Sequence, residues 1–153
     1  MQWRYDAVMS TEDPALLAMP AFALAHIGRA ARGAIKGTFE REGLSFRAHF
    51  VLLCLNTHGG LSQRELADRV GMDRSDLVKL LDGLETSGRL RRAPDPHDRR
   101  RHLLSITPEG AATLKRGEHL VGQATDQVLG RLSDEERATL HRLTLRALGS
   151  IGR

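Results

Sequence analysis

The chain has 153 residues, one cysteine and a net charge of +4, and 41% of its residues are hydrophobic while 27% are charged. This length suits one domain, or one domain with helical extensions, and the composition excludes a disordered chain. No run approaches the roughly 18 consecutive apolar residues of a membrane span, no signal peptide is visible, and a lone cysteine forms no internal disulfide. We therefore expect a cytoplasmic protein without membrane contact.

The positive charge is concentrated in one short stretch. Residues 89–101 contain six arginines and two aspartates, so these thirteen residues carry the whole net charge of the chain. A diffuse surplus of cations would indicate solubility alone, whereas a concentrated surplus is typical of a surface that binds polyanions.

Signatures of catalysis are absent from the sequence. There is no glycine-rich phosphate loop and no nucleophile elbow, and one cysteine cannot build a two-cysteine metal motif. No two of the seven histidines lie three or four residues apart, so no helix turn presents a histidine pair to a metal. Aromatic residues are scarce at 4%, which argues against stacking of single-stranded nucleic acid. We expect no enzyme activity, no cofactor and no metal site.

Helices are predicted for the first part of the chain. Asp13 and Pro14 form a helix start, and after Pro20 apolar residues recur at helical spacing as far as Arg41. Ser45 can cap a second helix, which stops at the glycine pair 59–60. Its apolar side is expected to consist of Phe46, Phe50, Leu53, Cys54 and Leu55.

The middle of the chain has the pattern of a helix-turn-helix. Residues 62–65 read as a capping box, Gly71 turns the chain, and Asp73 can cap a following helix. The fourth helix repeats leucine every three or four residues, which predicts one buried stripe. That stripe comprises Leu77, Leu80, Leu81 and Leu84.

A β-hairpin and two further helices are predicted after the fourth helix. Short extended runs at 89–92 and 102–106 flank a turn-rich, proline-containing tip. Thr107 and Pro108 then start a long helix that runs to about Gly130, and a second capping box at 133–136 opens the last one.

The predicted fold class is therefore mainly α, a winged helix-turn-helix with a small β-hairpin wing. A helix of this kind fits the DNA major groove with its N-terminal residues at base edges, and arginines at a hairpin tip suit the adjacent minor groove. The residues expected to bind DNA are Arg74, Ser75 and Lys79 on the helix and Arg99, Arg100 and Arg101 on the wing.

Residues 95–100 and 103–110 resemble the wing signature of the MarR family of transcriptional regulators, as does the stretch 84–88 followed by Arg92. The resemblance implies that Arg100 enters the minor groove and that Asp98 structures the wing. It also implies a homodimer on palindromic double-stranded DNA, with a winged domain at 43–110 and dimerisation regions at 1–42 and 111–153. Alanine-rich helix faces that permit close helix packing agree with this expectation: Ala23, Ala30, Ala31 and Ala34.

The resemblance further implies a repressor that releases DNA when a small effector, a phenolic or other lipophilic acid, binds near the dimerisation region. Trp3 and His26 are candidate residues of such a pocket, with plain packing as the alternative. Cys54 lies in an apolar run, which favours a buried structural thiol over a redox sensor, and both readings stay open. A winged-helix module that binds an acidic protein partner is the remaining alternative to a DNA-binding regulator.

Overall fold

The computed structural model describes residues 13–96, 98 and 101–149, and these residues form two compact units. Unit 2 comprises residues 36–121, and unit 1 comprises the residues up to 35 and those from 122 onward. Trp3, Arg99 and Arg100 lie outside the described residues.

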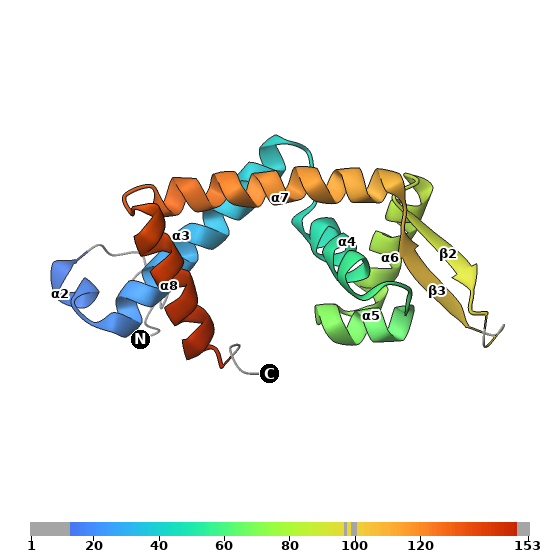
Figure 1. Ribbon diagram of the computed structural model, residues 1–153, viewed down its shortest axis with the longest axis horizontal. Coiled ribbons are helices and arrows are strands. Elements are labelled where there is room, and N and C mark those ends of the chain that lie inside the picture. Colours follow the sequence, from blue (N-terminus) through green and yellow to red (C-terminus); the bar gives the residue numbers. More distant parts are fainter. Residues whose placement is uncertain (1–12, 97, 99–100, 150–153) are drawn as a thin grey trace, which may run out of the picture. The chain divides into compact units, whose positions relative to one another are not determined.

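Unit 2 has the element order of a winged helix-turn-helix (Figure 1). Between α3 (Pro20–Arg41) and α7 (Pro108–Leu129) the chain forms six elements. They are, in order, α4 (Phe46–His58), β1 (Leu61–Ser62), α5 (Gln63–Val70), α6 (Arg74–Thr86), β2 (Leu90–Pro94) and β3 (His102–Ile106). The strands form an antiparallel sheet in the order β1-β3-β2. The predicted hairpin is confirmed, and the two-residue strand β1 is an addition that the sequence did not reveal.

The ends of the two central helices follow from the residues at their caps. The Ser62 hydroxyl accepts a hydrogen bond from the Glu65 amide while the Glu65 carboxylate accepts one from the Ser62 amide, so the predicted capping box is present. Gly71 ends α5 with a φ of 60°, a left-handed conformation that glycine adopts without strain. Asp73 caps α6 by accepting from the Ser75 amide at 2.8 Å.

The core of unit 2 lies beneath α6. Leu77 and Leu81 are 0% exposed and Leu84 is 4% exposed, whereas Leu80 is only partly buried. These leucines pack in one cluster with residues of α4, α5, the sheet and α7, which fixes the rotation of α6 about its own axis. The other buried members are Val51, Leu52, Cys54, Leu55, Leu61, Leu66, Ala67, Leu90, Leu104 and Leu114.

The expectation for the buried side of α4 was partly wrong. Phe46, Phe50 and Leu53 are 44%, 41% and 36% exposed, while His49, Val51 and Leu52 join Cys54 and Leu55 in the interior. The helix is apolar nearly all round, so the periodicity of its sequence does not select a face. Its contacts with α5 and β3 select the face instead.

Unit 1 is built from helices alone in the part that the structure describes. It contains α2 (Pro14–Leu17), most of α3 (Pro20–Arg41), the end of α7 (Pro108–Leu129) and α8 (Asp134–Ala147). The predicted capping box at Ser133 opens α8, yet neither α2 nor α8 has a buried residue. None of the described helices is both long and apolar enough to cross a membrane. The mainly helical winged fold class is confirmed.

Candidate DNA-binding surface

The first two turns of α6 present polar side chains to solvent. Arg74, Ser75 and Lys79 are exposed, and the buried Leu77 and Leu81 hold the helix against the core. All three residues predicted from the sequence are therefore accessible on a firmly held helix.

Ser75 takes part in the cap of this helix. Its hydroxyl donates a hydrogen bond to an Asp73 carboxylate oxygen at 2.6 Å, and its amide donates to the same oxygen. These two hydrogen bonds hold the pKa of Asp73 below its ordinary value. The hydroxyl proton of Ser75 is thus already used, and only the lone pairs of its oxygen remain for an external donor.

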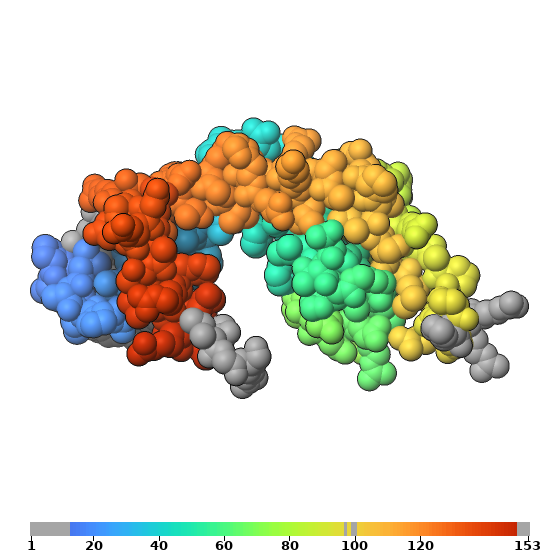
Figure 2. Space-filling view, viewed as in Figure 1, coloured from blue at the N-terminus to red at the C-terminus, as the bar shows by residue number. Residues whose placement is uncertain are grey.

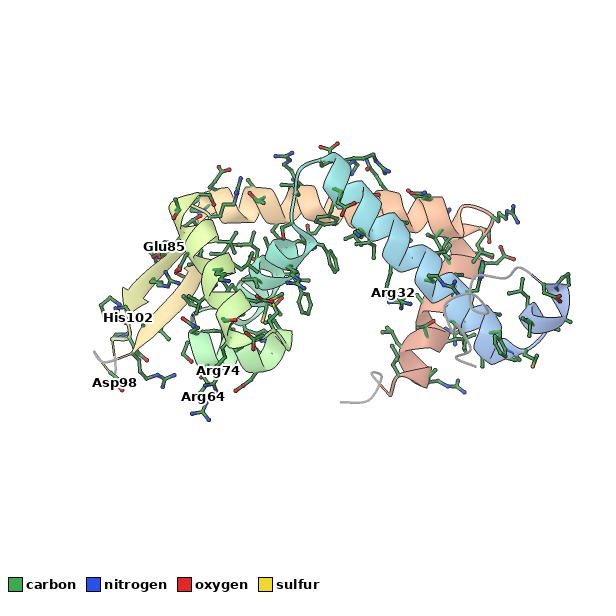
Figure 3. The ribbon with its side chains drawn as sticks, turned by 180° about the vertical axis from the view of Figure 1, so that it is seen from behind. Arg32, Arg64, Arg74, Glu85, Asp98 and His102 are labelled. Atoms are coloured by element: carbon green, nitrogen blue, oxygen red, sulfur yellow. The ribbon has the colours of Figure 1, made fainter. Side chains whose placement is uncertain are left out.

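Three cations on α5 and α6 have no hydrogen-bonding or ionic partner among the described residues: Arg64, Arg74 and Lys79. Arg64 and Arg74 project from their helices on the same side of unit 2 (Figure 3). Between them lies a notch of about 290 Å³ that Gln63, Ala67 and Leu77 also line. The sequence analysis missed Arg64, although the capping box places it in the exposed first turn of α5.

The wing is closed by backbone hydrogen bonds near its tip. The amide of Arg101 donates to the carbonyl of Asp98 at 2.9 Å, and the amide of Asp95 donates to the carbonyl of Arg101 at 2.9 Å. Asp98 therefore lies in the turn of the hairpin, as its predicted wing-structuring role requires. Figure 2 shows the surface of the hairpin beside that of α4 and α5 within unit 2.

Carboxylates from outside the basic stretch neutralise part of its charge. Arg101, predicted to bind DNA, lies 3.4 Å from a carboxylate oxygen of Glu65 on α5, and Arg92 pairs with Asp82 and Glu85 on α6. Hydrogen bonds from Ser62, with a smaller effect of Arg101, hold the pKa of Glu65 below its ordinary value. The positive charge counted along the sequence is thus larger than the charge that the described wing offers to a ligand.

A further ion pair links α6 to α4. The guanidinium of Arg47 lies 3.5 Å from a carboxylate oxygen of Asp76, and both side chains are more than half exposed. Such an exposed pair contributes little to stability, but it turns Asp76 toward α4.

A cavity of about 190 Å³ lies inside unit 2, away from α6's exposed face. His49 on α4 is 8% exposed, and its Nδ1 has no hydrogen-bond partner. The three rings of His49, Phe39 and Phe46 form one cluster: the imidazole centroid lies 5.4 Å from that of Phe39 and 6.4 Å from that of Phe46, and the two phenyl centroids lie 5.4 Å apart. Burial lowers the pKa of His49, so the ring is neutral near pH 7. The remaining lining includes Leu84, Arg89 and Gly117.

The other candidate ligand and redox residues lie elsewhere. His26 is on α3 in unit 1 and does not line this cavity, although its Nδ1 is also buried without a partner. Cys54 is buried in the core of unit 2, and burial raises the pKa of its thiol. A thiol with a raised pKa is a slow nucleophile, which favours the structural role over the sensor role.

Comparison with known proteins places this arrangement among regulators. The MarR family model matches residues 42–101, from just after α3 to just before β3. MarR of Escherichia coli is 34% identical over 103 residues, which cover 66% of this chain and 72% of MarR. The chain belongs to the MarR family of transcriptional regulators.

Three further matches, one relative and two solved structures, agree with this assignment. A Thauera aromatica protein assigned to regulation of the hcr operon is 39% identical over 99 residues, covering 65% of this chain but only 60% of that protein. The apo structure of E. coli MarR matches with a TM-score of 0.74 at 26% identity over 85% of this chain and 97% of MarR. PcaV of Streptomyces coelicolor, solved with its natural ligand, matches with a TM-score of 0.63 at 28% identity, covering 89% of this chain and 96% of PcaV.

Proposed function

We propose that this MarR-family regulator binds double-stranded DNA in a sequence-specific manner as a homodimer and acts as an effector-responsive repressor, without enzymatic activity. Its place of action would be the cytoplasm, where bacterial operators are found. The observation that carries the proposal is the set of cations on α5 and α6 that have no partner within the described part of the chain, on helices held in place by the leucine core beneath α6.

The geometry suits the major groove. A recognition helix contacts base edges through its N-terminal residues, and Arg74 and Lys79 lie in the first two turns of α6. Arg64 at the start of α5 is suited to a backbone phosphate, because the first helix of this motif crosses the sugar-phosphate backbone. The predicted contacts of Arg99, Arg100 and Arg101 with the minor groove complete the proposal on the wing.

Unit 1 supports the dimer. Its α3, α7 and α8 line an almost wholly apolar groove of about 270 Å³ that includes Leu24, Ile27 and Leu140. Leu24 is 63% exposed and Leu143 is 46% exposed. Among the described residues of unit 1 only Ala34 and Ala124 are buried. An apolar surface of this kind on helices with so small a core is typical of an interface between copies. A twofold dimer would bring two recognition helices to successive turns of a palindrome, roughly 34–36 Å apart.

Selection from a pool of random duplexes about 30 base pairs long, roughly three helical turns, tests DNA binding directly. We expect an inverted repeat to be enriched, and Arg74→Gln to weaken binding to it by about 1–3 kcal/mol if the side chain reads a base. Arg131→Gln is the matched control, because Arg131 is exposed, has no partner among the described residues and lies in the turn before α8. If no duplex is enriched, the protein-interaction alternative replaces the proposal.

The His49 cavity is the specific observation in favour of an effector. A neutral, buried imidazole whose Nδ1 has no partner offers one hydrogen bond, the phenyl ring of Phe39 lines the same cavity, and Arg89 supplies a cation there. These groups suit an aromatic acid, the phenolic class expected from the sequence.

Titration with a panel of hydroxybenzoic acids tests the effector site. We expect DNA release by at least one acid, together with a shift of the His49 imidazole nitrogen resonances. His49→Phe keeps the ring stacking and should bind DNA but no longer respond, whereas His26→Phe is the matched control and should respond normally. The reverse result would move the effector site to α3 in unit 1, and no response from the wild-type protein would remove the effector from the proposal.

A further inference from the structure

One arginine of the basic stretch faces inward. The Arg92 side chain on β2 is 25% exposed, and its Nη2 donates to an Asp82 carboxylate oxygen at 2.7 Å. Its Nη1 donates to one carboxylate oxygen of Glu85, and its backbone amide donates to the other at 3.3 Å. We call Arg92, Asp82 and Glu85 the Arg92 clamp.

The clamp joins the two elements that the proposed DNA contacts require. Asp82 and Glu85 are three residues apart on α6, so they lie on neighbouring positions of one helix face. On the other side, Arg92 pairs with Leu104 of β3 in the sheet, so a link at Arg92 holds both strands of the hairpin. Figure 3 shows Glu85 at the place where α6 meets the hairpin.

The guanidinium of the Arg92 clamp holds the two carboxylates in a fixed geometry, which a non-directional attraction between charges would not do. A guanidinium presents several donors in a rigid plane, so it can hold two carboxylates in set directions, which the single ammonium of a lysine cannot do. The additional bond from the Arg92 amide to Glu85 ties the strand backbone as well as the side chain. By comparison, the pair between Arg47 and Asp76 is longer at 3.5 Å and more exposed.

We propose that Arg92 is a positioning residue: it sets the wing against the recognition helix so that both contact one operator, and it touches no DNA itself. This inference rests on the proposed DNA binding. It assigns to Asp82 and Glu85 a supporting role in binding a polyanion, although each carries a negative charge.

The sign of the effect of Asp82→Asn distinguishes this role from plain electrostatics. Removing a carboxylate near DNA should strengthen binding if charge alone matters. The clamp predicts the opposite: on the inverted repeat selected by the wild-type protein, Asp82→Asn and Glu85→Gln should each weaken binding, on the order of ten-fold together. Binding to a scrambled duplex of the same composition should stay unchanged or become tighter.

Asp68→Asn is the control for charge. Asp68 is exposed on α5 and has no partner among the described residues, so its loss should leave binding unchanged or strengthen it on both duplexes. If Asp82→Asn behaves like Asp68→Asn, the clamp has no positioning role. Failure of the wild-type protein to select any duplex would instead overturn the proposed function itself.

Arg92→Lys separates positioning from contact. It keeps the positive charge but cannot hold both carboxylates, so we expect the same loss of discrimination between the two duplexes, with the wild-type slope of log K against log salt. A phosphate contact predicts the reverse: the lysine would keep the affinity, and Arg92→Gln would reduce that slope by about one unit. Hydrogen exchange of the β3 amides gives a readout without DNA and should become faster in Arg92→Lys. Unchanged exchange and unchanged discrimination would overturn the proposal.

Discussion

The two units of the chain differ in how far each completes its own interior. Unit 2 encloses thirteen buried apolar residues in one cluster, from Val51 on α4 to Leu114 on α7. In unit 1, α2 and α8 have no buried residue, and leucines such as Leu24 and Leu148 are 63% and 71% exposed. A folded chain rarely leaves contiguous apolar helix faces in water. The difference indicates that unit 2 is stable through its own packing, and it supports the proposed second copy as the partner of unit 1.

The largest expected effect is on the free energy of unfolding, and it differs between the interiors of the two units. Leu81→Ala removes a side chain that is 0% exposed and should lower the free energy of unfolding by about 2–5 kcal/mol at any protein concentration. Leu143→Ala, at a position 46% exposed, should cost less, and its cost should depend on protein concentration. Urea unfolding at two protein concentrations measures the loss of stability in both variants. An equal, concentration-independent loss for Leu143→Ala would show that unit 1 is complete in one chain.

A pair of glycines on α7 sharpens the comparison. A Cβ at Gly117 would lie 2.1 Å from His49 Nδ1 in unit 2, so Gly117→Ala should destabilise the protein by about 1–3 kcal/mol through overpacking.

Gly122, five residues further along in unit 1, has nothing within 4 Å of such a Cβ. Gly122→Ala should stabilise the helix by roughly 0.5–1 kcal/mol because alanine loses less backbone entropy than glycine. Thermal unfolding measures both variants. Destabilisation by Gly122→Ala would reveal that a second copy occupies this space.

The two capping boxes provide a smaller and nearly equal pair of effects. Ser62→Ala at α5 and Ser133→Ala at α8 each remove a hydroxyl that accepts from an amide at 3.3 Å, which should cost about 1 kcal/mol. Chemical denaturation would show a single transition for Ser62→Ala. A separate early transition for Ser133→Ala would mean that unit 1 unfolds on its own.

The smallest effect is a pH dependence confined to unit 2. Burial lowers the pKa of His49 below that of an unfolded histidine near 6.5, while Glu118 on α7 opposes part of this shift. Between the two values the unfolded chain binds more protons, so stability is full above about pH 6.5 and falls as the pH drops toward the folded value. His49→Phe should flatten this slope in urea unfolding. The lowered pKa values of Glu65 and Asp73 act at more acidic pH.

Local signals made most of the fold predictable. Caps at Ser45, Ser62, Asp73 and Ser133 satisfy the helix ends that their sequences indicate, and three of the four leucines in the predicted stripe of α6 are buried, with Leu80 partly buried. The outcome on α4 shows the limit, because a helix that is apolar all round, with Phe46 and Phe50 exposed, gives no periodicity to read.

The residues of the candidate site could be predicted from the sequence only where exposure of a side chain on its helix was enough to identify it. Arg74 and Lys79 are exposed cations in the first two turns of α6, where the sequence predicts contacts with DNA. The pairing of Arg92 with Asp82 and Glu85 joins a strand to a helix, and a count of charges along the sequence cannot anticipate it. The roles of Arg99 and Arg100 stay predictions from the wing signature.

Two helices pass from one unit into the other without interruption, since α3 contains residue 35 and α7 contains residue 122. Anyone who wants the winged part alone must therefore cut through a helix. A fragment that stops at residue 110 would discard Leu114, a member of the buried cluster, and should precipitate or fail to express. In a series of truncated fragments, a loss of core packing would be mistaken for a loss of activity. Point substitutions are therefore the sounder way to assign the functions of this protein.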